Sequence, residues 1–136
     1  MVRLTEISFA CEDPKRLAAF WAAALDYEVV DIPPKLQADM AEAGLDPDGI
    51  AAAADKEQKG PKLFFERKPK RPPVQNTSIP IHLDIESPDR RAHVARLVAL
   101  GGTVIEEKEL QVGDRLFEWT IMQDPEGNGF CVEQLA

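Results

Sequence analysis

Cysteine is scarce in this chain of 136 residues, which has only two. Cys11 and Cys131 are too few and too far apart to form the disulfide framework that is typical of small secreted proteins. We therefore expect a protein of the reducing cytoplasm.

Long apolar runs and an excess of positive charge are also lacking. No apolar run approaches the roughly 18 residues that a membrane span needs, and the start of the sequence, MVRLTEISF, lacks the pattern of a secretion signal. The chain has 16 Lys and Arg residues against 24 Asp and Glu residues, a net charge of -8 at pH 7. Because nucleic-acid binding depends on contacts between cations and phosphates, we do not expect nucleic acid as a partner. Since a membrane-spanning run is lacking, we do not expect a membrane as a partner either.

The most informative feature that is present is an internal repeat. Glu6 opens an alternating strand that is followed by Asp13 and a helix, and His82 opens the same arrangement with Asp89 about 75 residues later. An acidic N-cap residue followed by proline, as in Asp13-Pro14, is typical of a helix start. A duplicated unit of this kind can join its two sheets around one cleft, so equivalent residues of the two copies would meet there.

Each half of the chain is predicted to contain four strands and one helix in the same order. The predicted strands are 3–11, 27–32, 50–55 and 63–68 in the first half and 79–86, 103–107, 116–122 and 130–135 in the second; the helices are 13–25 and 87–100. The segment 34–60 has no counterpart in the second half, and 34–43 is a candidate short helix that ends at Gly44. The predicted fold class is α+β in a single domain, with module one at about 1–68, a linker at 69–78 and module two at about 79–136.

The order and spacing of several motifs resemble those of the vicinal oxygen chelate superfamily, in particular its glyoxalase-like single-domain proteins. The motifs are Asp13-Pro14 with Leu17 to Trp21, Leu63 to Arg67, His82 to Asp84, and Asp124 to Asn128 with Phe130-Cys131. The resemblance covers essentially the whole chain and implies two βαβββ modules that curl around one cleft. It also implies relatives that are metal-dependent lyases and isomerases, extradiol dioxygenases or metal-free antibiotic-binding proteins. Such proteins often form homodimers, and this chain could do the same.

Strand alternation independently predicts a polar face. If the apolar face of each strand packs on a helix, the opposite face carries the following residues: Glu6, Ser8, Phe64, Glu66, His82, Asp84, Glu86, Glu118, Thr120, Cys131 and Glu133. The same argument places Phe117, Trp119 and Ile121 against a helix. Buried polar groups are costly unless they are paired or bind a ligand, so this face is a candidate small-molecule cleft, although an antiparallel sheet can also have a solvated face without function. The candidate ligand-binding residues are Ser8, Phe64, Asp84, Glu118 and Glu133.

The resemblance further implies a candidate metal site. In metal-dependent relatives four ligands come from four strands, and the matching positions here are as follows: Glu6, Glu66, His82 and Cys131. Carboxylates with an imidazole suit one divalent ion such as Zn, Ni, Mn or Fe, and a thiolate favours Zn. The set departs from the family pattern, since Glu6 stands where His or Gln is usual and Cys131 stands where Glu is usual. With only one histidine at a ligand position, the extradiol dioxygenase site of two histidines and one carboxylate is not available.

Two functions remain open at this point, together with a vestigial cleft that does nothing. With a metal, the protein would be a glyoxalase-type lyase or isomerase, with the ion stabilising an enediolate-like anion and Glu66 acting as general base. Alternatively, Glu66 forms a surface ion pair with a cation such as Lys68. Without a metal, the cleft would bind a small molecule, as in the antibiotic-resistance relatives. Cys131 could act as a nucleophile beside His82, but its acidic neighbours should raise the thiol pKa, which favours a buried, inert cysteine.

Overall fold

The computed structural model describes residues 3–69, 81–112 and 114–135. The chain divides into two compact units, residues 1–71 and residues 72–136, here named the first and the second unit. The predicted linker from residue 70 onward and the start of the strand predicted at residue 79 lie outside the described residues. Among the described residues, no helix has the length and apolarity that crossing a membrane requires.

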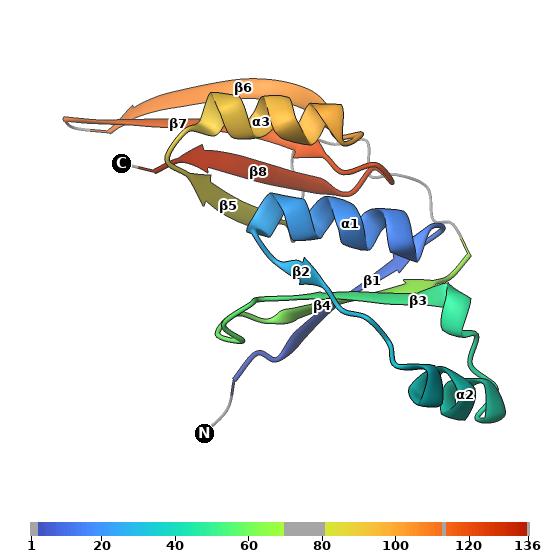
Figure 1. Ribbon diagram of the computed structural model, residues 1–136. Helices are drawn as coiled ribbons and strands as arrows, with labels where there is room; N and C mark the ends of the chain where they lie inside the picture. The colour runs from blue at the N-terminus through green and yellow to red at the C-terminus, as the bar shows by residue number, and fades with distance from the viewer. Residues whose placement is uncertain (1–2, 70–80, 113, 136) are drawn as a thin grey trace. The chain divides into compact units, whose positions relative to one another are not determined.

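The first unit is built on a four-stranded sheet with the strand order β1-β4-β3-β2. Its strands are β1 (Glu6–Cys11), β2 (Glu28–Val29), β3 (Ile50–Ala54) and β4 (Lys62–Arg67), and its helices are α1 (Pro14–Leu25), α2 (Pro34–Glu42) and the 3-10 helix η1 (Pro47–Gly49). Strand β1 runs parallel to β4, whereas β2, β3 and β4 pair antiparallel. This is the predicted β-α-β-β-β order, with α2 and η1 inserted between β2 and β3 (Figure 1).

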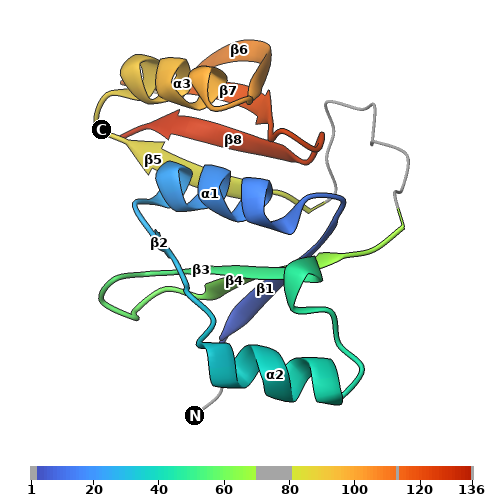
Figure 2. The same cartoon turned by 45° about the vertical axis from the view of Figure 1, so that its right-hand side comes forward.

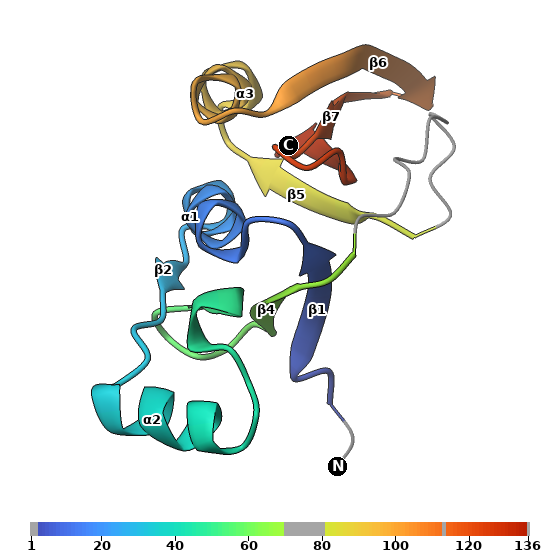
Figure 3. The ribbon, with the colours of Figure 1, turned by 90° about the vertical axis from the view of Figure 1, so that its right-hand side faces the viewer.

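Helix α1 covers one face of this sheet. Asp13 caps the helix by accepting a hydrogen bond from the backbone N–H of Arg16 at 3.2 Å, as the sequence predicts. The predicted apolar stripe is confirmed, since Leu17, Phe20 and Trp21 are buried. Views that differ by 45° and 90° show α1 on one side of the sheet and α2 on the other (Figures 2 and 3).

The second unit repeats this topology. Its sheet has the order β5-β8-β7-β6, with β5 (Leu83–Ser87), α3 (Arg90–Ala99), β6 (Thr103–Val112), β7 (Arg115–Gln123) and β8 (Gly129–Gln134). Strand β5 runs parallel to β8 and the other pairs are antiparallel. Strand β6 is longer than predicted because it pairs with β7 along its whole length, from Thr103 opposite Gln123 to Val112 opposite Arg115. The resulting hairpin runs past the end of β8 (Figure 1).

A tight turn between β7 and β8 sets the register of the second sheet. The carboxylate of Asp124, which is almost fully buried, accepts hydrogen bonds from the backbone N–H of Glu126 at 2.9 Å and of Asn128 at 3.0 Å, and from Asn128 Nδ2 at 2.8 Å. Gly127 adopts a φ of 87°, a conformation that a residue with a Cβ rarely adopts. The Asp-Pro-Glu-Gly-Asn motif is therefore a structural turn, and it places Cys131 opposite Ile121.

The predicted orientation of β7 is wrong. Thr120 pairs with Val132 and Trp119 pairs with Glu133, and directly paired residues of antiparallel strands share a face. Glu118 and Thr120 therefore point toward α3, while Phe117, Trp119 and Ile121 lie on the face opposite α3. The alternation rule failed because β7 carries apolar residues at both parities, so apolarity alone could not decide which side packs on the helix.

A polar cluster around the buried side chains of Arg90 and Thr120 explains why Thr120 faces α3. The guanidinium of Arg90 donates from Nη1 to Glu107 Oε2 and to Thr120 Oγ1, the latter at 2.6 Å, and Thr120 Oγ1 donates to Glu107 Oε2 at 2.9 Å. The Arg90 side chain is only 7% exposed. A buried charge is stable only when it is paired, so this cluster anchors the first turn of α3 to β6 and β7.

Replacing Arg90 by alanine should lower the free energy of unfolding by about 2 kcal/mol, because charged hydrogen bonds are lost and a void remains. Chemical denaturation followed by circular dichroism measures this change. Arg91→Ala is the matched control, since Arg91 is exposed on the same helix and its loss should cost less than about 0.5 kcal/mol. Equal losses in the two variants would contradict the anchoring role.

Candidate functional site

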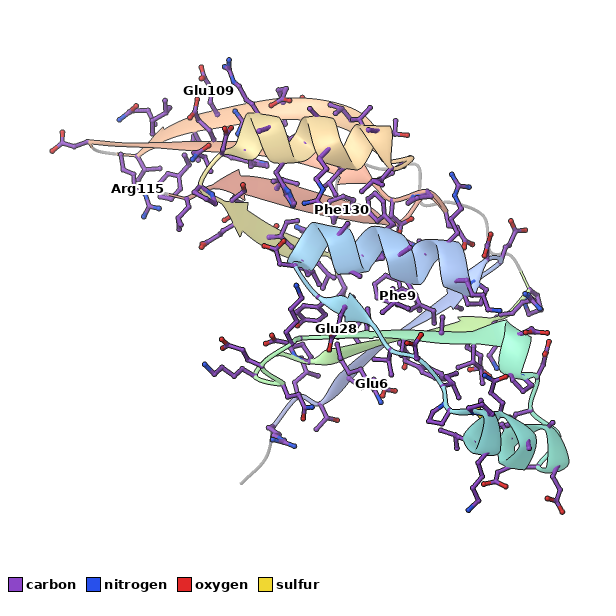
Figure 4. All side chains as sticks on the ribbon, viewed as in Figure 1. Glu6, Phe9, Glu28, Glu109, Arg115 and Phe130 are labelled. Carbon is purple, nitrogen blue, oxygen red and sulfur yellow. The ribbon has the colours of Figure 1, made fainter. Side chains whose placement is uncertain are left out.

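The face of the second sheet opposite α3, here named the α3-distal face, carries polar and apolar residues in adjacent rows. Strand pairing aligns Asp84, Cys131 and Ile121 in one row. The next row contains Glu86, Glu133, Trp119 and Lys108. Figure 4 shows Glu109 above the β6–β7 hairpin and Arg115 below it, so the two side chains point to opposite sides of the hairpin. The predicted face of Asp84, Cys131 and Glu133 is thus confirmed, and Trp119 and Ile121 join it.

Three of these side chains form a compact cluster. His82 Nε2 lies 3.2 Å from Asp84 Oδ1, and the thiol of Cys131 also hydrogen-bonds to Asp84. The potential ligand atoms of His82, Asp84 and Cys131 lie within 4.8 Å of one another. Asp84 therefore links the imidazole to the thiol. The cluster combines His82 and Asp84, from the start of the second module, with Cys131 of β8, which the parallel pairing of β5 and β8 brings beside Asp84.

The thiol of Cys131 is held in its protonated form. Burial, the charge and hydrogen bond of Asp84, and the charge of Glu133 raise the pKa of Cys131 to about 11. The expectation that acidic neighbours raise this pKa is confirmed. A protonated thiol is a poor nucleophile, so the arrangement favours a hydrogen-bonding role over covalent catalysis by Cys131.

In the first unit, the predicted residues share a face but do not form one cluster. Glu6, Ser8, Phe64 and Glu66 lie on the side opposite α1, with Ser8 opposite Phe64, and Figure 4 shows Glu6 on the far side of the sheet from Phe9 and α1. Glu66 stands opposite Ala10, four residues beyond Glu6, which is about 13 Å along the strands. The backbone register thus separates the two carboxylates that were predicted to be ligands of one metal ion.

Both of these carboxylates have a lysine partner. Glu6 Oε2 lies 3.3 Å from Lys62 Nζ, and Ser8 donates a hydrogen bond to Glu6 at 3.5 Å. Glu66 Oε1 lies 3.4 Å from Lys68 Nζ. The ion pair with Lys68 is the alternative that the sequence offered to a general-base role of Glu66. Each pair is partly exposed and contributes little to stability.

The donors of the His82–Asp84–Cys131 cluster fit a zinc ion in their chemistry. Imidazole, carboxylate and thiolate are the three zinc ligands of proteins, and three of them leave a fourth position open. Asp84 is a candidate metal ligand in this cluster, although it was not among the four ligands that the resemblance implied. Cys131 would have to lose its proton on binding, so metal affinity would rise with pH.

Sequence reasoning missed Trp119, although a signal for it was present. Residues at equal distances from a tight hairpin turn pair with each other. Counting outward from the predicted turn at Asp124 to Asn128 pairs Trp119 with Glu133, a residue already assigned to the candidate cleft. The turn, rather than the alternation of apolar residues, indicates which residues of this strand share a face with Glu133.

The family of the chain is established by sequence. A family model described as a glyoxalase-like domain matches residues 6–133. The chain therefore belongs to the glyoxalase-like domain family, and the predicted vicinal oxygen chelate superfamily and its two-module α+β fold are confirmed. A comparison with curated proteins found no match.

Solved structures with this fold include enzymes and binding proteins. A glyoxalase/bleomycin resistance protein/dioxygenase family enzyme from Burkholderia phytofirmans PsJN is 14% identical with a TM-score of 0.64, covering 99% of this chain and 100% of that chain. TnmS3, an antibiotic binding protein from Streptomyces sp. CB03234, is 17% identical with a TM-score of 0.62, covering 100% and 98%. TioX from Micromonospora sp. ML1 is 14% identical with a TM-score of 0.58, covering 98% of both chains. At these identities the likeness extends to the fold alone.

Replacing Asp84 by asparagine should lower the pKa of the Cys131 thiol. The change removes a negative charge while it keeps a hydrogen-bond acceptor of the same size. A pH titration of the Cys131 Cβ resonance by NMR measures the effect, and in the unchanged protein the resonance should remain that of a thiol up to about one unit below the pKa of about 11.

Two further variants define the specificity of this effect. Glu133→Gln should lower the pKa by less than Asp84→Asn, because the charge of Glu133 is the smallest of the contributing causes. Glu118→Gln should leave the pKa unchanged, since Glu118 lies on the other face of the sheet. A titration curve of Asp84→Asn that overlays that of the unchanged protein would refute the proposed coupling.

Proposed function

We propose that this protein binds a small organic molecule on the α3-distal face of its second unit, without a metal ion. The observation that carries the proposal is the position of the His82–Asp84–Cys131 cluster, which lies directly beside Ile121 and one row from Trp119 on the same face. A few placed polar groups next to apolar and aromatic side chains are the common composition of small-molecule sites.

The hydrogen-bonding state of the cluster supports a binding role. Asp84 already contacts both His82 and Cys131, so the polar groups are arranged before any ligand arrives. A preorganised site loses less conformational freedom on binding. The protonated thiol of Cys131 and the ion pairs of Glu6 and Glu66 with lysines also support binding without a metal. To bind a metal ion, Cys131 would have to lose its proton, and Glu6 and Glu66 would have to give up their ion pairs.

The comparison with solved structures is consistent with this function. TnmS3, which shares the fold over nearly its whole length, is an antibiotic binding protein. A binding role on this fold therefore has a precedent, although identity of 17% transfers no ligand to this chain. The ligand class must come from the residues of this chain themselves.

A metal-dependent lyase or isomerase is the second candidate, and the close approach of three potential ligand atoms favours it. His82, Asp84 and Cys131 would hold the ion, which would act as a Lewis acid on a substrate oxygen. Glu66 is the general base that the sequence predicts, and in the first unit it forms an ion pair with Lys68.

Binding without a metal predicts that ligand responses survive chelation. We would screen a fragment library against isotope-labelled protein in EDTA by NMR. Binders should perturb the resonances of Asp84, Ile121 and Cys131, and Trp119→Ala should weaken them about three- to tenfold, since an aromatic contact contributes about 1 kcal/mol. Arg91→Ala serves as the control on the exposed side of α3. A library without any effect on these resonances would refute the proposed binding face.

Metal content separates the two candidates. Protein purified without added metal or chelator should contain no stoichiometric metal by mass spectrometry, and thermal stability should not respond to Zn, Ni, Co or Mn. Near-stoichiometric zinc that is lost in His82→Ala would instead make the lyase or isomerase the leading function.

A further inference from the structure

The apolar part of the α3-distal face continues onto the hairpin beyond β8. Leu110 pairs with Phe117, and Val112 pairs with Arg115, on the same face as Trp119 and Ile121. Leu110, Val112 and Phe117 are exposed. Because residues 115–118 pair only with β6, this part of the face is not continued by β8. On this face the apolar side chains thus come from β7 and the end of β6, whereas β5 and β8 contribute polar side chains.

The charges on this face do not balance. Four carboxylates lie on it, those of Asp84, Glu86, Glu106 and Glu133, against Lys108 and Arg115. Lys108 Nζ is held by Glu106 at 2.9 Å.

Arg115, the other cation on this face, interacts with an aromatic ring. The guanidinium of Arg115 stacks on Phe117, 4.2 Å from the ring centroid. Among the described residues, no Lys or Arg lies within ion-pairing distance of Glu86 or Glu133. Two neighbouring carboxylates on β5 and β8 therefore have no cation partner within residues 3–69, 81–112 and 114–135.

Glu133 is also the cross-strand neighbour of Trp119. Directly opposed side chains on neighbouring strands have Cβ atoms about 5 Å apart, so a group bound by the carboxylate lies within reach of the indole ring. A cation beside an aromatic ring is attracted by the negative face of the ring. One small area of the face thus offers both kinds of interaction that favour an organic cation.

We propose that the ligand of this face is an organic cation, in which a protonated amine or amidinium is attached to an apolar body of at least one ring. The charged group lies between Glu86 and Glu133, against Trp119, and the apolar body lies along the exposed side chains of Phe117 and Leu110. This inference rests on the proposed binding function and adds the chemical class of the ligand.

Three naphthalene derivatives that differ chiefly in charge test the class. They are 2-naphthylmethylamine, which is a cation at neutral pH, 2-naphthalenemethanol, which is neutral, and 2-naphthylacetate, which is an anion. Each is titrated into the isotope-labelled full chain in EDTA, and the shifts of the Trp119 indole and Ile121 methyl resonances give the dissociation constants. The cation should bind at least about tenfold more tightly than the alcohol, and the anion most weakly.

Substitutions locate the source of the preference. The double variant Glu86→Gln and Glu133→Gln should bring the cation to within about twofold of the alcohol, while the alcohol is unchanged. Trp119→Leu should weaken the cation by about five- to tenfold. Glu118→Gln is the matched control on the other face of β7 and should change nothing. The preference should also shrink at high salt, because exposed charges are screened.

The outcomes separate this inference from the function on which it rests. Equal affinities of the three compounds, with shifts on the α3-distal face, would overturn the cation class and leave the binding face intact. A cation preference that survives the double variant would place the cation elsewhere and overturn the assignment. Absence of shifts from all three compounds and from the fragment library would overturn both proposals.

Discussion

The arrangement of each unit depends on the parallel pairing of its first strand with its last, β1 with β4 and β5 with β8. Such a pairing cannot be made by a hairpin, so it needs a crossover helix that covers one face of the sheet. The helices α1 and α3 take this place. Each residue of interest then lies on one of two faces of its sheet, one that packs on the helix and one that points away from it.

Within the second unit, buried polar contacts decide that parity. The carboxylate of Asp124 organises the turn that pairs Trp119 with Glu133, and the Arg90–Glu107–Thr120 cluster holds the opposite face of β7 against α3. These groups contact no proposed ligand. They position Trp119 opposite Glu133, because a shift of β7 by one residue would turn Trp119 toward the helix and Glu118 away from it.

The two units differ in how their polar residues are used. In the first unit the carboxylates of Glu6 and Glu66 are separated by the register and paired with lysines. In the second unit His82, Asp84 and Cys131 meet, and Glu86 and Glu133 have no cation among the described residues. An internal repeat of the fold therefore does not imply a repeat of the chemistry, since function depends on particular side chains rather than on topology.

The sequence by itself determined the two modules, the helix cap at Asp13, the turn at Asp124 and the polar face of β1, β4, β5 and β8, because these follow from local periodicity and turn chemistry. Only the tertiary structure decided that Asp84 joins His82 and Cys131, and that Glu6 and Glu66 stay apart. These depend on which residues of distant strands pair. Register is a property of two strands together, and the apolar pattern of one strand cannot specify it when both of its faces are apolar.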